Sequence, residues 1–179
     1  RYDRVVAIAS QKKEIDYIQS FIGNRICVVA GSTWEQDEKL LSEWMNSSSD
    51  ACLIIAPHVV NESHIQRIQQ LFSQSQRYSL VKSSGTIALN SNVLIIDSIG
   101  LLSALYRYGN IAYVGGGFSA GIHNTLEAAV YGIPVIFGPN YKKFDEAKAL
   151  INHSGGISVA NNQEGANILN SLVKDENKR

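Results

Sequence analysis

Short apolar runs rich in β-branched residues alternate along this chain with longer segments whose apolar residues recur at helical spacing. Several short runs are apolar at every position, which is typical of strands in a sheet covered by helices on both faces. The polar segment 73–85 predicts the end of a helix, a short strand near 78–81 and a loop. The other predicted strands are residues 5–9, 25–30, 52–56, 93–96, 111–114, 134–137 and 157–159.

Helices are predicted between these strands. Asn61 is a plausible N-cap for a helix that buries Ile65 and Ile68 at helical spacing. Alternation of strands and helices predicts right-handed crossovers and an α/β, doubly wound, Rossmann-like parallel sheet in a single domain, residues 1–179. The other predicted helices are residues 13–21, 35–46, 101–108, 124–131, 144–152 and 164–173.

Composition excludes several classes of protein. The chain is 45% hydrophobic and 18% charged, so it can bury a core, and its 16 basic and 16 acidic residues cancel. Zero net charge without a Lys/Arg cluster argues against nucleic acid as a partner. Cys27 and Cys52 fall inside predicted buried strands and are read as core residues in a reducing compartment. The chain begins at Arg1 without a signal peptide, so it looks like a piece of a longer protein.

Ligands of open parallel sheets bind beyond the carboxyl ends of the strands, so the residues after each strand are the candidate site. Residues 31–35 (GSTWE) follow the second strand, where Ser32 or Thr33 is either an ordinary helix N-cap or a contact to a ligand's phosphate or sugar. His58 after Pro57 is either a ligand contact or polar surface.

Residues 97–100 (DSIG) follow the fourth strand. Asp97 can cap the next helix, or the backbone near Ile99 and Gly100 can contact a base or sugar edge, because glycine permits close approach.

The strongest candidate is the glycine-rich turn Gly115–Gly121 after the fifth strand. Three consecutive glycines let the backbone pass close to a ligand. A helix predicted to begin near His123 aims free N–H groups at the same place, a gain of about 0.3–1 kcal/mol for an anion. Glu127, one helical turn after Asn124, is either solvent-facing or an acceptor for a ribose diol.

The pattern Gly115-x-Gly117-x-x-Ala120 also matches the dinucleotide fingerprint. That fingerprint requires a carboxylate at the end of the next strand, about 20 residues on, to hold the adenosine ribose. Residues 133–139 (IPVIFGP) contain none, and the turn follows the fifth strand rather than the first. A nicotinamide or flavin site is therefore rejected.

Together these segments resemble the C-terminal, donor-binding domain of GT-B glycosyltransferases, specifically the 3-deoxy-D-manno-octulosonic acid (Kdo) transferases. The matching stretches are 31–38 (GSTWEQDE), 56–58 (APH), 97–100 (DSIG), 113–140 (YVGGGFSAGIHNTLEAAVYGIPVIFGPN) and Phe144, in the family's order. The chain departs from the family at Leu101, where Glu is frequent, and at Val59 and Val60, near which the family has an Arg.

The resemblance implies transfer of Kdo from cytidine-5′-monophosphate-Kdo (CMP-Kdo) to a lipid A precursor in lipopolysaccharide synthesis, with inversion and with no metal or other cofactor. It implies that the catalytic base, the acceptor site and any membrane contact belong to a preceding domain, and that the isolated chain is inactive. The full protein would work at the cytoplasmic side of the bacterial inner membrane. The nucleotide-sugar contacts that it implies are Ser32, Thr33, Glu35, Pro57, His58, Ile99, Gly100, Gly116, Gly117, Phe118, His123, Asn124 and Glu127.

Other functions remain open from the sequence. Another GT-B domain or half of a UDP-sugar epimerase would bind a diphosphate and require more basic residues at the strand ends, where only Lys142 and Lys143 are near. A non-catalytic nucleotide- or phosphate-sensing module is the third possibility, although such a module does not require Trp34 and His58.

Overall fold

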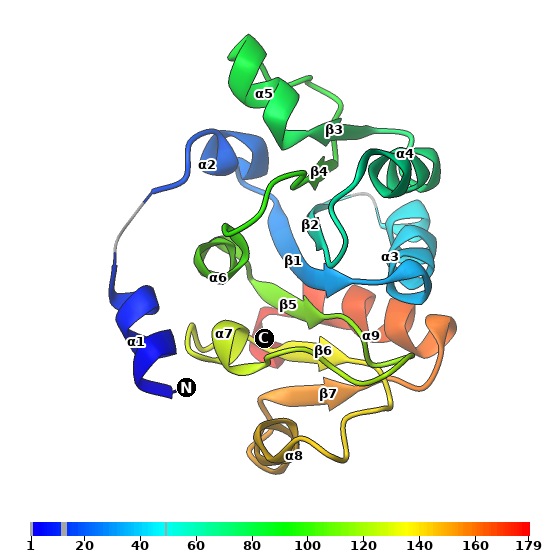
Figure 1. Ribbon diagram of the computed structural model, residues 1–179. Coiled ribbons are helices and arrows are strands. Elements are labelled where there is room, and N and C mark those ends of the chain that lie inside the picture. Colours follow the sequence, from blue (N-terminus) through cyan, green and yellow to red (C-terminus); the bar gives the residue numbers. More distant parts are fainter. Residues whose placement is uncertain (1, 12–13, 49) are drawn as a thin grey trace.

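The computed structural model describes residues 2–11, 14–48 and 50–179, and within them seven parallel strands form one sheet (Figure 1). The strands lie in the order β3-β4-β2-β1-β5-β6-β7, so the chain moves outward from β1 in both directions. This arrangement confirms the predicted doubly wound α/β fold. The strands are β1 Ile26–Thr33, β2 Ala51–Pro57, β3 Ser75–Arg77, β4 Val93–Ile95, β5 Ile111–Val114, β6 Val135–Phe137 and β7 Gly156–Ser158.

Helices cover both faces of the sheet (Figure 1). One face packs against α3, α4 and α9, and the other against α2, α5, α6, α7 and α8. The helices are α1 Tyr2–Ser10, α2 Ile18–Ile22, α3 Glu35–Ser47, α4 Glu62–Leu71, α5 Tyr78–Ser84, α6 Leu102–Leu105, α7 Leu126–Ala129, α8 Asp145–Asn152 and α9 Asn162–Lys174, with short 3-10 turns η1 Tyr106–Tyr108 and η2 Glu176–Lys178.

The central strands are buried on both faces, as their uninterrupted apolar sequences predict. Every residue of β2 and β5 is buried. Cys27 of β1 lies directly beside Cys52 of β2, and both are free thiols with no exposed surface, which confirms their assignment to the core.

Two strand predictions are wrong. Residues 5–9 belong to helix α1, because a short apolar run suits a helix as well as a strand and here packs outside the sheet, burying only Val5. Residues 78–81 begin helix α5, whose first turn is held by Asp97, which accepts hydrogen bonds from the backbone N–H and the hydroxyl of Ser79. The edge strand is instead the polar segment β3, which pairs with β4 through its backbone.

The other predicted elements occur with shifted ends. Asn61 is confirmed as an N-cap, since its side chain accepts from the backbone N–H of His64. The helix predicted at 13–21 is observed as α2, and its predicted first residue, Lys13, lies outside the described residues. In the described part of the chain, no helix combines the length and the apolar character needed to cross a bilayer.

Candidate functional site

The loops after β1, β2, β5 and β6 meet at one edge of the sheet, because parallel strands place their carboxyl ends together. Strand β1 lies between β2 and β5, so the loop beginning at Trp34 is next to the loop of His58 and to the glycine-rich turn. The structure thereby brings together the strongest of the sequence candidates.

A stack of three rings forms at this edge. His58 lies with its ring centroid 4.5 Å from Trp34 and 4.4 Å from His123, so it bridges the two. The indole Nε1–H of Trp34 also donates to Nε2 of His123 at 3.1 Å, so the neutral His123 ring carries its proton on Nδ1. Burial and the neighbouring His58 lower the pKa of His123, against a smaller opposing effect from Asp37.

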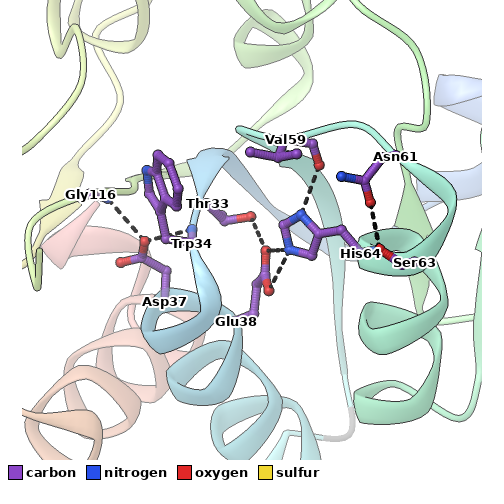
Figure 2. A network of polar contacts seen from close by, with 9 residues as sticks. All are labelled: Thr33, Trp34, Asp37, Glu38, Val59, Asn61, Ser63, His64 and Gly116. Carbon is purple, nitrogen blue, oxygen red and sulfur yellow. Dashed lines mark hydrogen bonds and ion pairs between the residues drawn. The ribbon is translucent and has the colours of Figure 1, made fainter.

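Asp37, in the first turn of α3, joins the glycine-rich turn to the start of this helix. Its carboxylate is 1% exposed and accepts from the Tyr113 hydroxyl at 2.7 Å, the Gly116 N–H at 2.9 Å and the Trp34 N–H at 2.9 Å (Figure 2 shows the two N–H contacts). Burial raises the pKa of Asp37, and the hydrogen bonds from these donors offset part of that rise. The sequence analysis missed Asp37, because its partners lie 76 and 79 positions away and only its place in the first turn was readable.

A second buried carboxylate fixes the loop that carries His58. Glu38 is hydrogen-bonded to the His64 ring, with Nε2 2.8 Å from Oε1, and accepts from the hydroxyl of Thr33 at 3.1 Å (Figure 2). The other ring nitrogen of His64 donates to the carbonyl of Val59 at 2.8 Å. Because that carbonyl can only accept, Nδ1 must carry a proton, and the pair ties α3 to α4 and to the residue beside His58.

The N-cap interpretation of Ser32 and Thr33 is wrong. Strand β1 continues to Thr33, Trp34 occupies the cap position, and the side chain of Asp37 reaches back to its N–H. Thr33 is fully buried and acts on the site through Glu38, whereas Ser32 is half-buried in a left-handed conformation. Glu35 is exposed and pairs with Lys39 at 3.0 Å.

The glycine-rich turn is built by close approaches between backbones. A Cβ on Gly115 would lie 2.3 Å from the carbonyl oxygen of Ser32, and one on Gly117 would lie 2.5 Å from the backbone nitrogen of Gly138. These two glycines are therefore required by the neighbouring loops. The N–H of Asn140 donates to Gly117 at 2.8 Å, which ties this turn to the loop after β6.

The helix after the turn begins later than predicted. It is α7, which starts at Leu126 rather than near His123 and is four residues long. The side chain of Asn124 accepts from the Leu126 N–H and donates to Glu127 at 3.1 Å, so this Asn holds the turn in place of helical bonds. Glu127 is half-buried and also accepts from Ser103 at 2.8 Å, so it is not solvent-facing.

Among the described residues, those of the loop after β4 form none of these hydrogen bonds. Asp97 binds Ser79 and so caps α5, not the helix that follows it in sequence. Ile99 is 88% exposed, and Gly100 has φ +93° with open space where a side chain would be. Pro57 is buried at the end of β2, and Phe118 packs against the α3 and α9 face of the core.

Two adjoining cavities open beside the glycine-rich turn. One of 580 Å³ is lined by residues 119–120 and 139–144, and one of 310 Å³ by residues 122–125, Phe144 and Glu146. Both volumes fall in the range of small-ligand pockets. Among the described residues, no group of three His, Cys, Asp or Glu side chains is placed to hold a metal ion.

Comparison with known proteins gives a consistent relationship. A 3-deoxy-D-manno-octulosonic acid transferase of Aquifex aeolicus is 34% identical over 152 residues, which cover 82% of this chain and 41% of the relative. The same enzyme of Rickettsia typhi is 27% identical over 175 residues, or 93% of this chain and 37% of the relative. This chain is a relative of the Kdo transferases. It spans about two fifths of the length of these curated relatives, and no family model matches it.

Solved structures confirm the GT-B type of fold. The structure described as the C-terminal CMP-Kdo binding domain of WaaA from Acinetobacter baumannii is 22% identical, covers 99% of this chain and 91% of that one, and superposes with a TM-score of 0.70. An alpha,alpha-trehalose 6-phosphate synthase of Burkholderia multivorans is 13% identical, covers 100% of this chain and 42% of its own, and superposes with a TM-score of 0.66. The resemblance drawn from the sequence is therefore confirmed.

Proposed function

We propose that this chain is the donor-binding domain of a Kdo transferase, which binds CMP-Kdo while Kdo is transferred to a lipid A precursor. The observation that carries the proposal is the match to Kdo transferases over 82–93% of the chain. The arrangement of the carboxyl edge supports it, because the motif segments 31–38, 56–58 and 113–140 meet there beside the two cavities.

The glycine-rich turn offers donors for the phosphate. Among the described residues, the backbone N–H groups of Gly117, Phe118, Asn124 and Thr125 have no hydrogen-bond partner. When CMP leaves, negative charge builds on the phosphate, and donors held in place beforehand stabilise that charge in the transition state. This support comes from the turn itself, because α7 is too short to act as a phosphate-binding helix.

Glu127 is the proposed ribose contact. Its carboxylate accepts from Asn124 and Ser103, which fix its orientation, and an ionised carboxylate retains acceptor capacity for further hydroxyl donors. His58 and Pro57, Ile99 and Gly100 would lie nearer the base. We place the catalytic base and the acceptor site in a domain outside this chain, at the cytoplasmic side of the inner membrane in the full protein, and expect no transfer by this chain alone.

Nucleotide titration tests the proposal. The chain should bind CMP more tightly than UMP, UDP or GDP, and Glu127→Ala should weaken CMP binding about tenfold, as the loss of one hydrogen bond to a charged group predicts. Glu176→Ala, an exposed carboxylate in the C-terminal turn, is the matched control and should leave binding unchanged. UDP binding as tight as CMP binding would contradict the Kdo assignment and favour a UDP-sugar enzyme. Equal binding of all four nucleotides would favour a phosphate-sensing module.

A further inference from the structure

The 580 Å³ cavity has basic side chains in its wall, whereas the smaller cavity has none and includes the carboxylate of Glu146. Phe144 lines both cavities, so a ligand that extends from one into the other would contact it. The ring is seated against Gly121, where a Cβ would lie 2.9 Å from Phe144 Cε2. The wall of the larger cavity includes Lys142 and Lys143, whereas His123 lines the smaller cavity.

These two lysines have no carboxylate partner in the part of the chain that the structure describes. The next lysine along, Lys148, is paired with Asp145 at 2.6 Å. Within the described lining of the two cavities, Lys142 and Lys143 are also the only lysines or arginines. An anionic group in the larger cavity would therefore face two ammonium groups, whereas the smaller cavity is lined by the carboxylate of Glu146.

The donor of the proposed function carries two anionic groups on one carbon. Kdo is an octulosonic acid, so its anomeric carbon bears the carboxylate and, in CMP-Kdo, the phosphate oxygen as well. A site that holds the phosphate at the glycine-rich turn must therefore place the carboxylate close by. We propose that Lys142 and Lys143 bind the carboxylate of the sugar acid and so select a donor that carries one; this rests on the proposed function.

The rest of the cavity fits the hydroxylated part of such a sugar. Asn140 is held by its own contacts, since its side-chain amide donates to the Ser119 carbonyl at 2.7 Å and its N–H donates to Gly117. Its side-chain oxygen remains as an acceptor, as does the hydroxyl oxygen of Ser119, whose O–H donates to the Gly116 carbonyl, and the hydroxyl of Tyr141 adds a donor and an acceptor. Polar groups fixed in this way orient a ligand at small cost in entropy.

The experiment compares CMP with CMP-Kdo on the same chain. Wild type should bind CMP-Kdo more tightly than CMP, and Lys142→Ala/Lys143→Ala should weaken CMP-Kdo binding about tenfold while CMP binding stays within about twofold. The preference for CMP-Kdo should shrink at high salt, because exposed charges are screened. Lys142→Arg/Lys143→Arg should retain it, and the control Lys148→Ala should change neither affinity.

Two results would overturn the inference. An equal loss of CMP and CMP-Kdo affinity in the double alanine variant would make the lysines phosphate contacts, and an unchanged preference for CMP-Kdo would place the carboxylate elsewhere. Both leave the proposed function intact, whereas failure of the wild-type chain to bind CMP defeats the proposed function itself. Both lysines are exposed, so the variants should fold, which circular dichroism checks.

Discussion

Asp37 should be the most costly side chain of the candidate site to remove. Asp37→Ala leaves the Trp34 N–H, the Gly116 N–H and the Tyr113 hydroxyl without their acceptor. Each hydrogen bond to a charged group contributes about 1.5–3 kcal/mol. Part of the stability lost with the three bonds is regained, because the variant no longer buries a carboxylate. We expect the free energy of unfolding to fall by about 3–4 kcal/mol and Tm by roughly 10 °C.

The same residue predicts a dependence on pH. Burial raises the pKa of Asp37, so the folded chain holds this proton more tightly than the unfolded chain does. The stability that the group contributes is therefore present in acid and is lost as the pH rises from about 4 through the folded-state pKa. Asp37→Asn keeps the shape but cannot titrate. Wild type should lose stability relative to this variant over that window.

Urea unfolding followed by circular dichroism at several pH values measures both effects. Asp145→Ala is the matched control, because that carboxylate is 93% exposed and its removal should leave the free energy of unfolding unchanged. A loss below about 1 kcal/mol in Asp37→Ala would refute the view that this carboxylate holds the loops together. If the difference in free energy of unfolding between wild type and Asp37→Asn does not vary with pH, the predicted effect of the raised pKa of Asp37 is refuted.

Two further predictions concern the same edge of the sheet. Gly115→Ala should lower the free energy of unfolding by about 3 kcal/mol, because its Cβ would lie 2.3 Å from a backbone oxygen. Gly155→Ala is the control and should lower it by less than about 1 kcal/mol, since the nearest atom to its Cβ is 3.6 Å away. Equal losses in urea unfolding would contradict this prediction. In a Trp44→Phe background, Trp34 fluorescence should change on acidification with a midpoint below about pH 6.5, because burial lowers the pKa of His123 and its protonation breaks the indole bond. A midpoint above that value would contradict the lowered pKa of His123.

The long apolar strands were predictable from sequence because burial on both faces leaves a continuous pattern. Strand β3 was not, since its polar residues join the sheet through backbone pairing with β4, which no side-chain periodicity records. Residues 5–9 show the reverse case, in which an apolar run favours two structures and tertiary packing decides between them.

Local sequence also located most of the candidate site, because parallel topology brings the strand ends together. It did not reveal what each residue touches. Thr33 looked like a cap and is a buried donor to Glu38, and Asp97 caps a helix that precedes it in the chain. Such partners are set by contacts between distant segments, so a motif gives the place of a side chain without its role.

The close approach of Gly117 to Gly138 also bears on how this edge can evolve. Each glycine fills the space that a side chain on the other would need, so a larger residue at either position cannot be rescued by a change at its partner. Diversity in ligand preference must then enter through positions that the contact leaves free, such as Lys142 and Lys143 on the next stretch of loop. The two glycines thus hold the architecture constant while their neighbours vary.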